Sequence, residues 1–270
     1  MRELPIVVDV LLNDYIGLVN EYMPNQLAGL YLHGSLALDA FVEGASDIDF
    51  IAVTQRGLTE SELKKAEEIH RIIADKYQFP EMDGVYLTQN DLGTLCECFF
   101  YNNGTMNYGH FLNPVTWWLL KKKGIVIYGA VPVIEINDND LVSYTYENMN
   151  TYWANRIQTF EESIDELTQI ADSKIDKEVE WTVLGILRQF YTLREKDIIS
   201  KQGAGEYSLK HLPEKWHPII VDAINIRRGE ENRHYTRKRD RIEETIKLSK
   251  FLISQSSNQK LVSFPSVKLT

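Results

Sequence analysis

The sequence predicts an α+β protein in which a mixed sheet with flanking helices precedes an all-helical region. Short apolar runs typical of strands alternate with helical patterns in the first half of the chain, and only helical patterns occur from about residue 141 onward. A chain of 270 residues is also long enough for two domains of ordinary size. We therefore expect one domain over residues 1–140 and a helical domain over residues 141–270.

The first half has the pattern of a sheet crossed by helices. Apolar residues at helical spacing predict a helix over Leu11–Met23, ended by Pro24. A capped helix is expected after Thr59. The other expected elements are strands at Leu27–His33, Asp49–Thr54, Gly84–Thr88 and Gly124–Gly129, and a helix that opens at Asn113 with Pro114 in its first turn.

The second half contains four long helical patterns. Small-molecule sites often form where two domains meet, so we expect this half to complete a site with the first. The four predicted helices span Leu141–Leu167, Asp176–Lys196, Trp216–Arg228 and Arg239–Ser254.

Composition excludes several classes of protein. Hydrophobic residues make up 44% and charged residues 25% of the chain, as in soluble globular proteins. No apolar run approaches the ~20 residues of a membrane helix, and the first residues show no signal peptide. Cys96 and Cys98 are a poor disulfide pair and too few for a zinc site, so we expect packing residues in a reducing compartment. We therefore expect a cytoplasmic protein with no membrane partner. A monomer is also expected, although the sequence does not fix the oligomeric state.

The charge balance bears on the partner. The formal net charge is −10, whereas nucleic-acid phosphates require a basic surface. We therefore expect no nucleic-acid partner. An acidic cleft would instead attract a cationic small molecule, although the acidity could equally serve solubility alone.

Two aspartates inside an apolar run form the most informative motif. Side chains alternate along a strand, so Asp47 and Asp49 project to the same side. Two adjacent carboxylates repel each other without a cation, and Mg²⁺ prefers oxygen ligands shared with phosphate. The nearby turn at Gly34 and Ser35 offers backbone N–H groups and a hydroxyl for phosphate. The motif predicts a nucleotide–metal site; the alternative is a solvated hairpin with two surface aspartates.

These residues resemble a known family. Gly34-Ser35 followed by Ser46-Asp47-x-Asp49 is similar to the signature of the nucleotidyltransferase superfamily related to DNA polymerase beta. The resemblance extends to the aminoglycoside adenylyltransferases that modify streptomycin and spectinomycin. It implies a polymerase-beta-like first domain and the Mg²⁺-dependent transfer of AMP from ATP to a hydroxyl of an aminoglycoside-type antibiotic, which would confer resistance.

The resemblance implies roles for three carboxylates. Asp47 and Asp49 would bind one or two Mg²⁺ ions that hold the nucleotide's phosphates. A third carboxylate would take the proton from the acceptor hydroxyl and so contact the substrate. We assign it to Asp83, directly before the third strand, although the antibiotic-modifying members more often carry Glu there. Glu81 is the second choice, and the alternative for Asp83 is an ordinary turn residue.

Further positions match residues that bind the nucleotide in the resembled family. Ser35 and Ser46 would contact the triphosphate, together with the Gly34 turn; their alternative is local capping. Asn113 would reach the nucleotide or only cap its helix.

In the helical half, Arg188 interrupts an apolar face and Lys201 follows the helix. The resemblance implies that both bind the triphosphate. The alternatives are an Arg188 tied to an acidic neighbour and a solvated Lys201.

The acceptor's amine would meet Glu178, with Glu180 as the second choice; the alternative for Glu178 is an acid that favours the helix dipole. Relatives that accept streptomycin carry another carboxylate where this chain has Lys174. Spectinomycin is therefore favoured over streptomycin.

Rival functions remain open at this point. The same chemistry could act on another small metabolite or on a protein side chain. A non-catalytic nucleotide-binding module is the rival of another class, although Asp47, Asp49 and Asp83 are all present. The modified hydroxyl and the choice between ATP and other nucleotides are also open.

Overall fold

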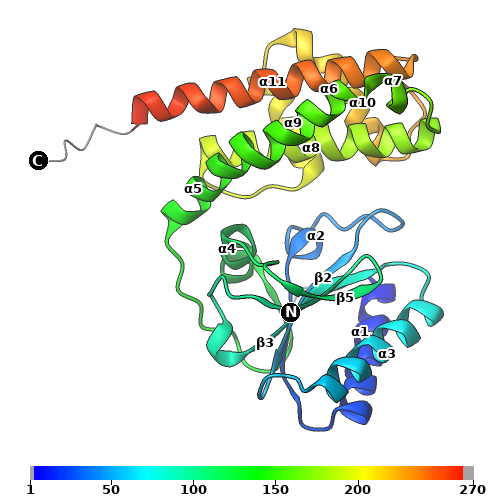
Figure 1. The fold of residues 1–270 in the computed structure, drawn as a ribbon, viewed down its shortest axis with the longest axis vertical. Helices are drawn as coiled ribbons and strands as arrows, with labels where there is room; N and C mark the ends of the chain where they lie inside the picture. Colours follow the sequence, from blue (N-terminus) through cyan, green and yellow to red (C-terminus); the bar gives the residue numbers. More distant parts are fainter. Residues whose placement is uncertain (1–2, 264–270) are drawn as a thin grey trace, which may run out of the picture. The chain divides into compact units, whose positions relative to one another are not determined.

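The computed structural model describes residues 3–263, with side chains up to residue 256. The chain divides into two compact units, Met1–Asn137 and Asp138–Thr270. The division falls three residues before the 140/141 boundary expected from the sequence. Figure 1 shows a sheet with helices in the first unit and helices in the second.

The N-terminal unit is built on a six-stranded mixed sheet. Its strand order is β5-β4-β3-β2-β1-β6, and β2 pairs with β3 in parallel whereas the other pairs are antiparallel. Helix α3 connects the two parallel strands. The elements are α1 (Ile6–Tyr22), β1 (Leu27–Leu32), α2 (Gly34–Ala37), β2 (Ile48–Thr54), α3 (Glu60–Lys76), β3 (Met82–Thr88), a 3₁₀ turn (Gln89–Asp91), β4 (Cys98–Asn102), β5 (Thr105–Gly109), α4 (Pro114–Lys123) and β6 (Ile125–Tyr128).

Side-chain alternation divides this sheet into two buried faces. Phe50 and Tyr86 lie on the face covered by α1 and α3. Ile51 and Val85 lie on the opposite face, where Trp117 of α4 packs. Residues that lie two or four positions from Ile51 or Val85 on the same strand therefore belong to the α4 side of the sheet.

Local signals set several helix starts as expected. The Thr59 hydroxyl accepts a hydrogen bond from the backbone N–H of Glu62, and the Glu62 carboxylate accepts one from the N–H of Thr59, which completes the capping box. Asn113 caps α4 through its side-chain oxygen. The two cysteines are free, and Cys98 packs in an apolar cluster.

In the N-terminal unit, three main features differ from the sequence-based expectation. The third strand begins at Met82 rather than at Gly84, so Asp83 lies inside the strand and not before it. The four-residue helix α2 and the β4–β5 hairpin were not predicted. The hairpin turns through Asn103 and Gly104, both at positive φ, which is the Asn-Gly signal of a two-residue hairpin loop.

The C-terminal unit consists of helices arranged around α8, which packs against α5, α9, α10 and α11. Its core includes Val183, Leu184 and Leu187 of α8. The elements are α5 (Asp138–Asn148), a π-helical turn (Met149–Trp153), α6 (Ala154–Glu162), α7 (Ile164–Leu167), α8 (Asp172–Glu195), α9 (Lys201–His211), a 3₁₀ turn (Glu214–Trp216), α10 (His217–Arg227) and α11 (Lys238–Ser263).

Helix α9 was not predicted, and Lys201 is its first residue. Gly203 and Gly205 weaken the helical pattern, because glycine is a poor helix former. Gly205 is needed for packing, since a Cβ there would lie 2.8 Å from Ile224 of α10. The available signal was Ser200, whose hydroxyl accepts a hydrogen bond from the N–H of Gly203 and caps the helix.

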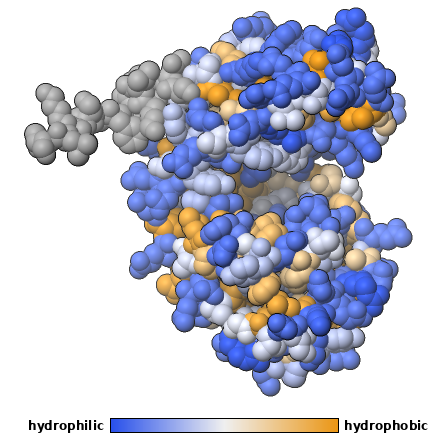
Figure 2. All heavy atoms as spheres, in the orientation of Figure 1, coloured by the Kyte–Doolittle hydropathy of each residue, from blue (hydrophilic) through white to orange (hydrophobic). Residues whose placement is uncertain are grey.

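In the view of Figure 2, hydrophilic residues cover most of the surface of both units. Within residues 3–263, each helix is too short or too polar to span a bilayer.

Candidate functional site

The structure brings two of the predicted carboxylates together in the sheet. Asp49 and Asp83 are direct partners in the parallel register of β2 and β3. By strand alternation, the side chains of both residues belong to the face of the sheet that α4 covers. Asp47, two residues before Asp49 and just outside β2, falls on the same side. Asp47 is exposed, whereas Asp49 and Asp83 are partly buried. The result is an acidic group at the start of two neighbouring strands.

Asp83 differs electrostatically from an ordinary aspartate. Burial raises its pKa to about 6, and the charges of Asp47, Asp49 and Glu81 act in the same direction. The backbone N–H of Asn103 opposes this by donating to Asp83 Oδ1 at 3.2 Å. A carboxyl group with this pKa can take up or release a proton near neutral pH.

The hairpin turn orients the Asp83 carboxylate. Asn102 Nδ2 donates a hydrogen bond to Asp83 Oδ2 at 2.8 Å, while Asn103 binds the other oxygen. Sequence reasoning missed both residues, although the Asn103-Gly104 turn could have pointed to the hairpin. Glu81, the second choice for the base, is exposed and precedes β3.

The Gly34 turn is fitted to Asp49. Gly34 has φ +60°, and a Cβ at this position would lie 1.7 Å from Asp49 Oδ2. The Asp49 carboxylate therefore occupies the space that any other side chain would need. The N–H of His33 donates to the carbonyl oxygen of Asp49 at 3.0 Å, which fixes the turn to β2. Burial lowers the pKa of His33, although the charge of Asp49 opposes this.

The hydroxyls at this end of the sheet differ in their partners. Ser35 Oγ is buried and has no hydrogen-bond partner among the described residues, so it can serve a ligand. Ser46 Oγ already accepts a hydrogen bond from the N–H of Val42 at 3.0 Å. The side-chain oxygen of Asn113 accepts from two N–H groups of α4. Ser46 and Asn113 thus have local structural roles in this structure.

The acidic group suits a cation that brings its own additional ligands. Among the described residues, no group of three or more His, Cys, Asp or Glu side chains is arranged to hold a metal ion. Mg²⁺ does not require such a cage, because one or two carboxylates plus phosphate oxygens and waters complete its shell. Asp47 and Asp49 can supply the protein's share.

The C-terminal unit contains a compact group of charges. Glu180 of α8 accepts from Lys201 Nζ at 3.3 Å through each oxygen and from Arg227 Nη1 at 2.9 Å through Oε1. Burial lowers the pKa of Lys201, and the positive charges of Arg227 and Arg188 add to this, whereas Glu180 raises it. Lys201 is therefore not a solvated surface lysine. Glu180, engaged by two cations, is a poor candidate for binding a substrate amine.

Glu178 also has a partner within the protein. Arg156 of α6 forms an ion pair with Glu178 through Nη2. The Arg156 guanidinium lies 4.3 Å from the ring centre of Trp181 and 4.7 Å from that of Phe160. Since α8 begins at Asp172, Glu178 lies beyond the first helical turn, which removes the helix-dipole explanation for it.

Comparison with known proteins covers both units. Residues 156–250 match the family model described as aminoglycoside adenylyltransferase, C-terminal domain. The chain is similar in structure to spectinomycin adenyltransferase AAD(9) from Enterococcus faecialis, solved with ATP and spectinomycin. The TM-score is 0.62 at 20% identity, over 91% of this chain and 98% of that chain. None of the curated proteins matches the sequence significantly.

The structural likeness confirms the α+β fold expected from the sequence. Residues 156–250 are identified as an aminoglycoside adenylyltransferase C-terminal domain.

Proposed function

We propose that this protein transfers AMP from ATP to a hydroxyl of an aminoglycoside-type antibiotic, with spectinomycin favoured over streptomycin. The observation that carries the proposal is the pairing of Asp49 with an Asp83 whose pKa is raised to about 6. Transfer of AMP to a hydroxyl requires a carboxylate that binds the metal and a base that accepts the proton of the hydroxyl. The family match of residues 156–250 and the likeness to an enzyme solved with ATP and spectinomycin support the choice of substrates.

In this proposal, Asp47 and Asp49 would hold Mg²⁺ together with the phosphates of ATP. The bound ion would neutralise charge on the α-phosphate and on the departing pyrophosphate. The Ser35 hydroxyl, buried without a hydrogen-bond partner among the residues described, donates to a phosphate oxygen. The Gly34 turn keeps the Asp49 carboxylate in place.

Asp83 acts as the general base. The acceptor hydroxyl loses its proton to Asp83 as its oxygen bonds to the α-phosphorus, and the bond to pyrophosphate breaks. An ordinary aspartate is a weak base, and the raised pKa of Asp83 brings it closer to the proton affinity that the step needs. Asn102 and Asn103 hold the carboxylate oriented during the transfer.

The C-terminal unit supplies charged ligands of its own. We assign Arg188 and Lys201 to the phosphates of ATP, because Lys201 lies close to the positive charges of Arg188 and Arg227. Glu178 is assigned to an amine of the acceptor. Its pairing with Arg156 implies that the amine must displace the guanidinium or bind beside it.

The direct test is pyrophosphate release with ATP or GTP across a panel that includes spectinomycin and streptomycin. We expect release with ATP and spectinomycin. Asp47→Asn and Asp49→Asn should each lower the rate by at least about 100-fold, because each removes a metal ligand's charge. Asp75→Asn removes an exposed carboxylate of α3 and should leave the rate unchanged. Turnover near the parental rate in both site variants would contradict the metal assignment.

A pair of glycine variants tests the geometry of Asp49. Gly34→Ala should weaken Mn²⁺ binding, measured in the presence of ATP, by at least about tenfold, because the new Cβ displaces the carboxylate. Gly44→Ala is the matched control: its φ is +81°, but no atom lies within 4 Å of the added Cβ. Both variants have backbone strain, and only the first has the collision. Equal metal affinity in the two variants would show that Asp49 does not hold the metal.

Arg156 offers a test of the acceptor site. Arg156→Gln frees the Glu178 carboxylate, so a cationic acceptor such as spectinomycin should bind about 3- to 10-fold more tightly in calorimetry. Arg239→Gln removes the same charge from another ion pair of the C-terminal unit and should have no such effect. Unchanged acceptor affinity in Arg156→Gln would exclude Glu178 from the acceptor site.

A further inference from the structure

The three residues of the charged group in the C-terminal unit, Glu180, Lys201 and Arg227, differ in how far their side chains are exposed. The exposed fraction of the side chain is 9% for Arg227, 12% for Glu180 and 22% for Lys201. Arg227 and Glu180 are thus almost equally buried, and Lys201 is the most exposed of the three. Its ammonium group has three N–H donors, and Glu180 engages it only at 3.3 Å. The Lys201 ammonium group can therefore donate a further hydrogen bond to another oxygen.

The balance of charge at this position favours an anionic ligand. Two arginines and one carboxylate act on Lys201 from the packed helices: Arg188 and Glu180 of α8 and Arg227 of α10. Three positively charged side chains thus lie close together in a chain whose formal net charge is −10. Positive charges gathered in this way attract a polyanion.

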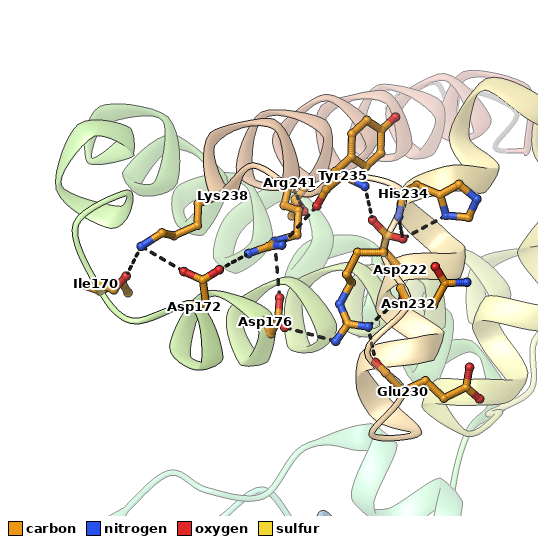
Figure 3. A network of polar contacts seen from close by, with 12 residues as sticks. Ile170, Asp172, Asp176, Asp222, Glu230, Asn232, His234, Tyr235, Lys238 and Arg241 are labelled. Atoms are coloured by element: carbon orange, nitrogen blue, oxygen red, sulfur yellow. Dashed lines mark hydrogen bonds and ion pairs between the residues drawn. The ribbon is translucent and has the colours of Figure 1, made fainter.

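The helices that carry this group are held in register by a separate network. The carboxylate of Asp222 in α10 accepts from the N–H groups of His234 and Tyr235, which fastens the segment after α10 back onto that helix (Figure 3). Asp176 of α8 is bound by Arg233 of the same segment and by Arg241 of α11. Asp176 lies one helical turn before Glu180, so this network fixes the part of α8 from which Glu180 reaches Arg227.

We propose that Glu180 is a positioning residue, anchored by Arg227, that holds the Lys201 ammonium in place and protonated for a phosphate group of the nucleotide. This inference rests on the proposed function, because it takes the ligand to be a nucleoside triphosphate. Glu180 is not assigned a contact with the substrate. Its carboxylate offsets the two guanidinium charges that otherwise act on Lys201 and fixes where Nζ lies.

The proposal predicts a specific change in pH dependence. Burial and two neighbouring arginines already lower the pKa of Lys201, and Glu180 is the group that raises it. In Glu180→Gln the pKa therefore falls further, and Lys201 loses its proton at a lower pH than in the parent. Below that pH Lys201 is charged in the variant as in the parent, so the difference in affinity between the two is smallest there. Above it, binding weakens.

The first arm of the test uses the full chain without nucleotide. The side-chain resonances of Lys201 are followed by NMR against pH in the parent, in Glu180→Gln and in Glu206→Gln. Glu206 is the matched control, because it is a carboxylate of α9, the helix of Lys201, that pairs with Arg228. We expect a lower Lys201 pKa only in Glu180→Gln. Identical titrations in the parent and Glu180→Gln would overturn the proposal.

The second arm measures the affinity for ATP with Mg²⁺ at about pH 6.5 and about pH 9. Between these values, Glu180→Gln should lose about 5- to 10-fold in affinity, whereas the parent and Glu206→Gln change by less than about twofold. Lys201→Met should bind weakly at both pH values and show no such dependence. Glu180→Asp, which keeps the charge with a shorter reach, should show a smaller effect in the same direction and serves if the Gln variant does not fold.

The two arms separate the inference from the proposed function. A parent that binds no ATP contradicts the proposed function, while the NMR titration still decides whether Glu180 controls Lys201. A parent that binds ATP, together with a Glu180→Gln variant that shares its pH profile, overturns the inference alone. A purely structural Glu180 would lower the melting temperature without changing either profile.

Discussion

The parallel pairing of β2 with β3 is the constraint on which the N-terminal site depends. It sets Asp49 directly opposite Asp83, so two carboxylates share one end of the sheet. Such a pair is unfavourable in a folded protein unless a cation or a proton intervenes. The two carboxylates lie in different surroundings, which reduces their mutual repulsion. Asp49 lies over the Cβ-free surface of Gly34, whereas Asp83 is desolvated and has its pKa raised to about 6. The proposed division between metal ligand and base follows from this difference.

The parts of the site that depend on local sequence could be predicted. Strand alternation alone puts Asp47 and Asp49 on one side, and the structure gives both the parity of the α4 face. The caps at Thr59 and Asn113 follow from side chains that bind N–H groups two or three residues away. The sequence predicts a phosphate-binding turn at Gly34, and this stays a prediction. The close approach of Gly34 to Asp49 could not be predicted, because that contact joins the start of α2 to β2.

The parts that depend on distant residues could not be predicted. The hairpin that orients Asp83 pairs β4 with β3, and no local pattern sets that register. Arg156 meets Glu178 across 22 positions, and Arg227 meets Glu180 across 47. The charged residues themselves are visible in the sequence. Which of them pair with each other depends on how the helices pack. Such pairs give Glu178 and Glu180 different roles, although the two residues are close neighbours on one helix.

The central claim is that Asp49 holds the metal and Asp83 accepts the proton. The most direct measurement compares Asp49→Asn with Asp83→Asn for ATP–Mg²⁺ affinity by calorimetry and for AMP transfer in a single turnover. We predict that Asp83→Asn binds ATP within about threefold of the parent but transfers AMP at least about 100-fold more slowly, while Asp49→Asn loses both. Loss of ATP binding in Asp83→Asn, or transfer at the parental rate, would contradict the account.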